Sequence, residues 1–136
     1  MSFEKKIIAT DKAPAAVGTY SQGVFHNGVF YFSGQIGLDA KTGEMAPTFD
    51  GQLENVMKNI DGLLQSQDLT RANIIKTTVF LTDLAQFGKV NEAYTKFFQA
   101  PYPARSTIQV AALPKGGVVE IEVIAAKYYV WKKIRF

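Results

Sequence analysis

The sequence predicts an α+β fold in which one mixed β-sheet carries two helices on a single face. Three observations support this prediction: the Asn27-Gly28 turn signal between two strand-like segments, two later segments with apolar residues at helical spacing, and further strand-like segments beside them. The 136 residues suit a single domain over positions 1–136, because no linker or low-complexity stretch divides the chain.

The first third of the chain predicts a short strand followed by a hairpin. Residues 5–10 suit the strand, and residues 21–35 suit the hairpin. Asn27 and Gly28 tolerate the positive φ angles that a tight type I′ turn requires. Residues 34–43 contain three glycines, which interrupt the strand pattern and indicate a loop.

Two helices follow, separated by a β-branched strand at residues 77–81. For the first helix we expect Asp50 as the N-cap. Its apolar stripe consists of Leu53, Val56, Met57, Ile60, Leu63 and Leu64. For the second helix, Asp83 and Gln86 suit a capping box. The second stripe consists of Phe87, Val90, Tyr94, Phe97 and Phe98.

The last predicted strands are residues 107–111 and 118–130, separated by a turn at 113–117. If both helices cover the same face of the sheet, its other face is left with many apolar residues. We therefore expect another subunit to cover that face.

Composition excludes several classes of site. Cysteine is absent, so disulfides, thiolate nucleophiles and Cys-based metal sites are excluded. His26, the single histidine, precedes the predicted turn and is expected to be a surface residue, so no metal site is expected. The sequence contains no run of about 18 apolar residues and no N-terminal signal pattern, which predicts a cytoplasmic protein without a membrane span.

The net charge of +3 is concentrated at the C-terminal end. Four basic residues and no acidic ones lie in the last ten positions, whereas positions 1–126 hold 11 basic and 12 acidic residues. The body of the protein is therefore close to neutral, which disfavours binding of a polyanion by the main fold.

Arg105 is unusual because it lies between a proline-rich connection and a predicted strand. An arginine in such a place can hold a carboxylate through two parallel hydrogen bonds. An ordinary salt bridge, with Glu120 as the strongest candidate, explains it equally well.

Glu120 and Glu122 interrupt an apolar strand and share one of its faces. A solvated sheet face would explain both. However, Val118 and Ile124 lie on the same face, which predicts partial burial and a raised pKa suited to proton transfer.

Asn91 and Ser33 are ambiguous polar residues. Asn91 falls on the stripe of the second helix, where a buried amide either holds a loop or faces a pocket. Ser33 has no nearby base to activate it, so we interpret it as a hydrogen-bonding residue.

Taken in order, short segments of the chain resemble the RidA (YjgF) family of imine deaminases over about residues 5–127. The segments are residues 13–23 (with Tyr20-Ser21-Gln22-Gly23), Ser33-Gly34-Gln35-Ile36, residues 76–81 with Asp83-Leu84, Val90-Asn91, Phe97-Phe98, Pro103-Ala104-Arg105-Ser106, Leu113-Pro114-Lys115 and Val119-Glu120-Ile121-Glu122. Each segment alone is weak, whereas the ordered set is highly specific.

The resemblance implies a chorismate-mutase-like fold, a homotrimer with ligand sites between subunits, and hydrolysis of 2-imino acids to 2-oxo acids and ammonia without a cofactor or metal. It also implies roles for individual residues. Arg105 would clamp the substrate carboxylate and Glu120 would position or activate water. The residues expected to shape the pocket and bind substrate are Tyr20, Ser33, Gly34, Asn91 and Thr107.

Two features depart from the family pattern. Many relatives carry a cysteine where this chain has Thr107, so no thiol-dependent chemistry is expected. Residues 128–136 extend beyond the end of many relatives. We expect an extended last strand with a solvated end there, and the alternative is that their aromatic and basic side chains bind RNA or an acidic partner.

Imine deamination is the leading functional hypothesis. The first alternative is endoribonuclease activity or translation inhibition, for which family members have also been described. The second is a ligand-binding or chaperone-like module that binds 2-oxo acids without turnover.

Overall fold

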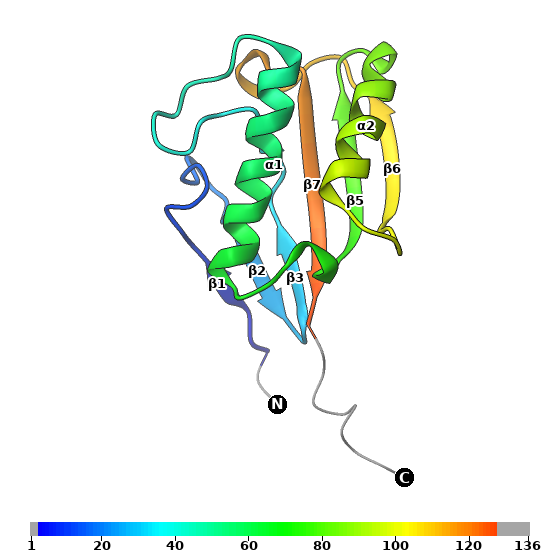
Figure 1. The fold of residues 1–136 in the computed structure, drawn as a ribbon. Coiled ribbons are helices and arrows are strands. Elements are labelled where there is room, and N and C mark those ends of the chain that lie inside the picture. The colour runs from blue at the N-terminus through cyan, green and yellow to red at the C-terminus, as the bar shows by residue number, and fades with distance from the viewer. Residues whose placement is uncertain (1–2, 128–136) are drawn as a thin grey trace.

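The computed structural model describes residues 3–127, so the tail at 128–136 and the predicted end of the last strand lie outside the described residues. The strands of the sheet (Figure 1) are β1 (Lys6–Ile8), β2 (Gly23–His26), β3 (Val29–Phe32), β4 (Gln35–Ile36), β5 (Ile74–Leu81), β6 (Ala104–Gln109) and β7 (Val119–Ala126). The helices are α1 (Phe49–Ser66) and α2 (Phe87–Phe97).

The sheet is mixed, as predicted. Its strands lie in the order β1-β2-β3-β7-β5-β6, and β4 pairs separately with β7. Strands β5 and β6 are parallel because α2 carries the chain back between them, whereas the other pairs are antiparallel. Strand β7 therefore lies at the centre, with β5 between it and the edge strand β6.

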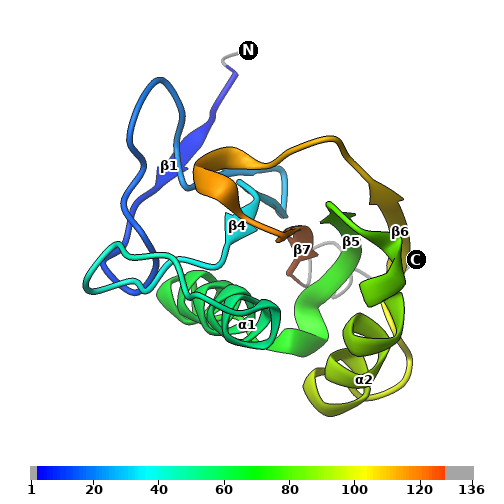
Figure 2. The same cartoon turned by 90° about the horizontal axis from the view of Figure 1, so that it is seen from above.

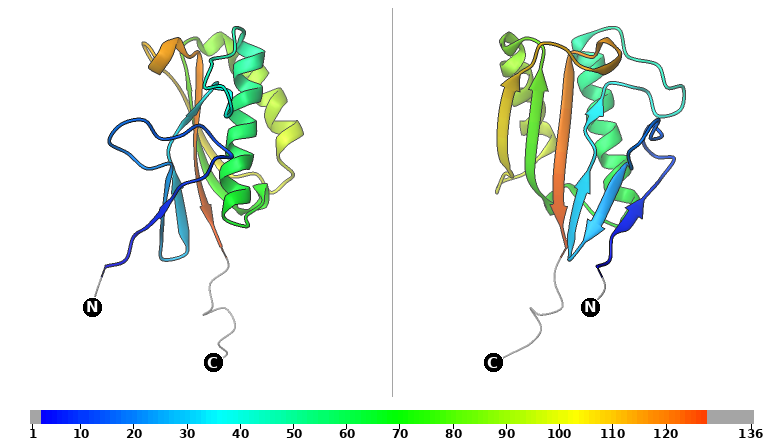
Figure 3. Two further views of the ribbon diagram at one scale, coloured as in Figure 1. Left: turned by 90° about the vertical axis from the view of Figure 1, so that its left-hand side faces the viewer. Right: turned by 180° about the vertical axis from the view of Figure 1, so that it is seen from behind.

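Both helices cover the same face of the sheet, which confirms the predicted α+β architecture (Figure 2). The core between the layers contains Val56, Ile60 and Leu63 of α1 and alternate residues of β7, all of them almost fully buried. Seen from behind, the other face of the sheet carries no helix (Figure 3). Exposed apolar side chains on that face include Ile7, Tyr31 and Ile108.

The hairpin of β2 and β3 confirms the turn prediction. Asn27 and Gly28 have φ angles of 50° and 80°, and His26 pairs with Val29 across the turn. Both central residues therefore have the left-handed conformation of a type I′ turn.

Both predicted helix starts need correction. Thr48, and not Asp50, caps α1: its backbone is extended and its Oγ1 accepts a hydrogen bond of 3.0 Å from the Gly51 N–H. Asp50 already lies in the first turn, where its charge favours the helix dipole. Asp83 caps a short 3₁₀ helix at Leu84–Gln86, and α2 begins only at Phe87.

Several strands also differ from the prediction. Strand β1 is shorter than residues 5–10, and β5 begins at Ile74 rather than at residue 77. Strand β6 begins at Ala104 rather than at residue 107, because pairing with β5 starts at Lys76 and continues without a break. Strand β4 lies within the predicted loop, where two residues pair with β7. No helix within residues 3–127 is both long and apolar enough to cross a bilayer.

Candidate functional site

Arg105 is the second residue of β6 and its side chain lies on the helix-covered face. It pairs with Thr77 of β5, whose side chain is buried under α2. The Arg105 guanidinium carbon lies 4.9 Å from the ring centre of Tyr94 and 5.1 Å from that of Phe87. Among the described residues no acidic side chain forms an ion pair with Arg105. Its hydrogen-bond donors are therefore free to bind an anion.

Thr107 follows on the same face of β6, opposite the fully buried Val79 of β5. Within residues 3–127 its hydroxyl is the one buried side-chain polar atom without a hydrogen-bond partner. A buried hydroxyl without a partner is costly in a folded protein. Its place two residues from Arg105 makes it a candidate ligand contact.

Asn91 lies on α2, four residues after Phe87 and three before Tyr94, so the three side chains share one side of the helix. The prediction that Asn91 is buried is wrong, because its side chain is exposed. The helix core is formed instead by Val90, Tyr94 and Phe97. We call Arg105, Thr107 and Asn91 the arginine cluster.

Glu120 belongs to a second group of predicted residues, on the opposite face of the sheet. It pairs with Ile36 of β4, and its side-chain carboxylate packs against the backbone of Gly34. A Cβ atom on Gly34 would collide with the Glu120 carboxylate and would lie 2.8 Å from its Cδ. Gly34 is therefore required for the close approach of Glu120.

Ser33 precedes Gly34 in the chain, and Tyr20 lies with Ser33 on the open face, in a groove whose glutamate is Glu122. The Ser33 hydroxyl donates a 2.6 Å hydrogen bond to the carbonyl of Ser21, which ties the end of β3 to the loop before β2. Tyr20 is exposed on that loop, with its hydroxyl 3.4 Å from the Val17 nitrogen. Tyr20, Ser33 and Glu122 line a groove of about 400 Å³ on the open face. We call Glu120, Gly34, Ser33 and Tyr20 the glutamate cluster.

The electrostatics of Glu120 suit proton transfer. Burial raises the pKa of the Glu120 carboxyl, and the nearby negative charge of Glu122 raises it further. Val118, Glu120 and Ile124 are half-buried, which confirms the predicted partial burial of this face, whereas Glu122 is exposed.

The arginine cluster and the glutamate cluster do not meet within one chain. Residues at alternate positions of a strand point to opposite faces, and the pairings place Arg105 on the helix-covered face and Glu120 on the open one. Strand β5 also separates their strands. A salt bridge between Arg105 and Glu120, the alternative considered from the sequence, is therefore wrong.

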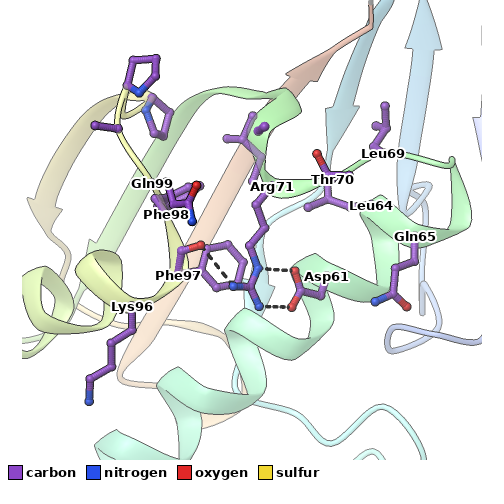
Figure 4. Close-up of a pocket in the computed structure, with 15 residues that line it drawn as sticks. Asp61, Leu64, Gln65, Leu69, Thr70, Arg71, Lys96, Phe97, Phe98 and Gln99 are labelled. Atoms are coloured by element: carbon purple, nitrogen blue, oxygen red, sulfur yellow. Dashed lines mark hydrogen bonds and ion pairs between the residues drawn. The ribbon is translucent and has the colours of Figure 1, made fainter.

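A cavity of about 600 Å³ lies elsewhere, between the end of α1 and residues 97–103 (Figure 4). Arg71 crosses it and donates two hydrogen bonds to Asp61, of 3.0 and 2.7 Å, and one to the Phe97 carbonyl. The charges of Arg71 and Asp61 neutralise one another, and the cavity contains none of the predicted site residues.

Sequence reasoning missed the aromatic side chains that hold Arg105. Phe87 and Tyr94 were assigned only to the helix core, although Phe87 is 40% exposed. Their spacing of seven residues, which places both rings on one side of a helix, was the available signal. Within residues 3–127 no three His, Cys, Asp or Glu side chains gather closely enough to hold a metal ion.

Comparison with known proteins shows which family the chain resembles in sequence. The model of the family described as endoribonuclease L-PSP matches residues 10–127. The 2-iminobutanoate/2-iminopropanoate deaminase of Rattus norvegicus is 45% identical over 127 residues, which cover 93% of each chain.

Two solved structures share the fold. RidA from a Psychrobacter species is 48% identical with a TM-score of 0.87, over 90% of this chain and 99% of that one. Escherichia coli TdcF with bound serine is 43% identical with a TM-score of 0.86, over the same shares of the two chains.

Proposed function

This chain belongs to the endoribonuclease L-PSP (RidA/YjgF) family, and we propose that it is a 2-iminobutanoate/2-iminopropanoate deaminase. In this proposal it hydrolyses 2-imino acids to 2-oxo acids and ammonia without a cofactor. The observation that carries the proposal is Arg105, a partly buried guanidinium that is held by two aromatic rings and forms no ion pair among the described residues. The deaminase name of the Rattus norvegicus relative supports the choice of substrate.

Arg105 binds the substrate carboxylate in the proposed mechanism. Its planar guanidinium can donate two parallel hydrogen bonds to the two carboxylate oxygens, which fixes both the position and the orientation of the substrate. The Thr107 hydroxyl and the Asn91 amide lie on the same side and contact the rest of the ligand or a bridging water.

Glu120 activates the attacking water and transfers protons in the proposed mechanism. Its carboxylate accepts a proton as water attacks C2 of the protonated imine, which gives a tetrahedral carbinolamine. The same proton then passes to the amine nitrogen. As the C–N bond breaks, the carbinolamine O–H proton returns to the Glu120 carboxylate, and the 2-oxo acid and ammonia leave. Because the iminium carbon is already electrophilic, orientation of substrate and water supplies much of the acceleration.

The site is completed by a second subunit in this proposal. The two clusters lie on opposite faces of one chain, and the open face exposes Ile7, Tyr31 and Ile108. A chorismate-mutase-like homotrimer would bury such a face and place the glutamate cluster of one subunit against the arginine cluster of the next.

A coupled reaction tests the proposed function. A threonine dehydratase releases an imine intermediate, and formation of 2-oxobutanoate is followed with and without the purified protein. We expect the wild type to accelerate its release, and Arg105→Ala to abolish the effect while the oligomer remains intact by light scattering.

Other outcomes of this experiment support the alternatives. Binding of 2-oxobutanoate without acceleration of its release would favour a ligand-binding module. Cleavage of single-stranded RNA by both proteins, without an effect on the imine, would favour an endoribonuclease.

A further inference from the structure

Tyr94 forms a buried hydrogen bond beneath Arg105. Its hydroxyl donates to Thr77 Oγ1 over 2.8 Å, and the two side chains are only 7% and 1% exposed. Burial raises the pKa of the Tyr94 hydroxyl, so this group stays protonated and remains a donor. The bond fixes the tip of the tyrosine ring against strand β5.

The fixed ring supports the Arg105 guanidinium. Thr77 pairs with Arg105 across β5 and β6, so the residue that holds the Tyr94 hydroxyl is also the strand neighbour of the arginine. The guanidinium carbon lies 4.9 Å from the centre of the Tyr94 ring. Phe87 lies on the same side of α2, seven residues before Tyr94. Its ring centre is 5.1 Å from the same guanidinium carbon.

We propose that Tyr94, oriented by Thr77, is a positioning residue that holds Arg105 ready to bind a carboxylate. This inference rests on the proposed function, because it concerns the same carboxylate site. Tyr94 acts through Arg105 in this proposal and needs no contact with the substrate.

The type of contact explains why an aromatic ring suits this task. An aromatic ring attracts a guanidinium through the face of the ring. The N–H donors of the guanidinium, in contrast, lie in the plane of the guanidinium itself. A carboxylate in place of the ring would occupy those donors and compete with the substrate. Tyr94 therefore restricts the position of Arg105 while leaving its hydrogen-bonding groups free.

Calorimetric binding of two ligands tests the inference in the full-length protein. The ligands are 2-oxobutanoate and its uncharged amide, 2-oxobutanamide, which differ in the group that Arg105 recognises. The variant is Tyr94→Leu, which removes the ring. The matched control is Phe97→Leu, because Phe97 lies on the same helix, is also 7% exposed, and supports a different arginine, Arg71, at 3.9 Å.

We expect Tyr94→Leu to weaken binding of 2-oxobutanoate about tenfold and to leave binding of the amide nearly unchanged. Both variants should lower the melting temperature by a similar amount. Phe97→Leu, however, should not change the preference for the carboxylate over the amide. Equal losses for both ligands in Tyr94→Leu, or the same loss of preference in Phe97→Leu, would show a merely structural role and overturn the proposal.

A milder change covers the case in which Tyr94→Leu does not fold. Tyr94→Phe keeps the ring and removes only the bond to Thr77, and we expect about threefold weaker binding of 2-oxobutanoate alone. Unchanged binding would remove Thr77 from the proposal and overturn it. Because binding is measured without turnover, failure of imine hydrolysis with the carboxylate preference intact would contradict the proposed function and leave this inference standing.

Discussion

Arg105 and Glu120 lie on opposite faces of one sheet, with β5 between their strands. Neighbouring strands are about 4.8 Å apart, so a strand between them and opposed side chains prevent a small ligand from touching both groups in one chain. A site that uses both must therefore take them from two copies of the protein.

Mixing two inactive variants tests this shared site. Arg105→Ala and Glu120→Ala should each abolish activity alone, because each removes one cluster. In oligomers reassembled from equal amounts of both, about a quarter of the sites should combine an intact arginine cluster with an intact glutamate cluster. Imine hydrolysis by the mixture should recover to about that fraction of wild type.

Exchange of subunits must be verified in the same experiment, by mass spectrometry of the intact oligomer. A mixture that has exchanged subunits and still lacks activity would contradict the shared site. Mixing of two independent Arg105→Ala preparations is the matched control and should recover nothing.

Glu122→Gln should shift the pH profile of the enzyme. Burial and the charge of Glu122 both raise the pKa of Glu120, and the substitution removes only the second cause. If the Glu120 carboxylate is the active form, activity falls as the pH falls through its pKa. A lower pKa therefore moves the acid limb of kcat/KM to lower pH. Glu54→Gln, which removes a charge from the exposed side of α1, should leave the limb in place.

Gly34→Ala should reduce activity through steric conflict. The added Cβ atom would collide with the Glu120 carboxylate and displace it, and misplacement of a reacting group by about 1 Å can cost about 100-fold in rate. The matched control is Gly88→Ala, since a Cβ at Gly88 meets no atom within 4 Å. We expect it to keep full activity and to be at least as stable as the wild type, because Gly88 lies in the first turn of α2 and alanine favours a helix more than glycine does. Full activity of Gly34→Ala would contradict the assigned position of Glu120.

Thr107→Val tests whether the Thr107 hydroxyl contributes to substrate binding or only to the fold. Valine has nearly the same shape, and the buried hydroxyl that it removes has no partner among the described residues. The melting temperature should therefore stay the same or rise. If the hydroxyl binds substrate or a bridging water, KM for the imine should rise about three- to tenfold. An unchanged KM would exclude Thr107 from the site.

Local patterns predicted much of the fold. The Asn27-Gly28 turn, the apolar stripe of α1 and the alternation of β7 depend on neighbours only a few residues apart, so the chain itself displays them. The N-cap of α1 was assigned two residues late, because Thr48 and Asp50 are both good caps and only the backbone angles separate them. Strand β4 was missed because two residues carry too little pattern.

The sequence determined the residue types of the site: an arginine, two glutamates on one strand face, and the glycine beside Ser33. Only the tertiary structure decided their arrangement. Which face each side chain reaches depends on the pairing of β5 with β6 and β7, and these contacts join segments far apart in the chain. That pairing excluded the bridge between Arg105 and Glu120 and placed Arg105 over Tyr94, because strand alternation fixes faces only after the partners are known.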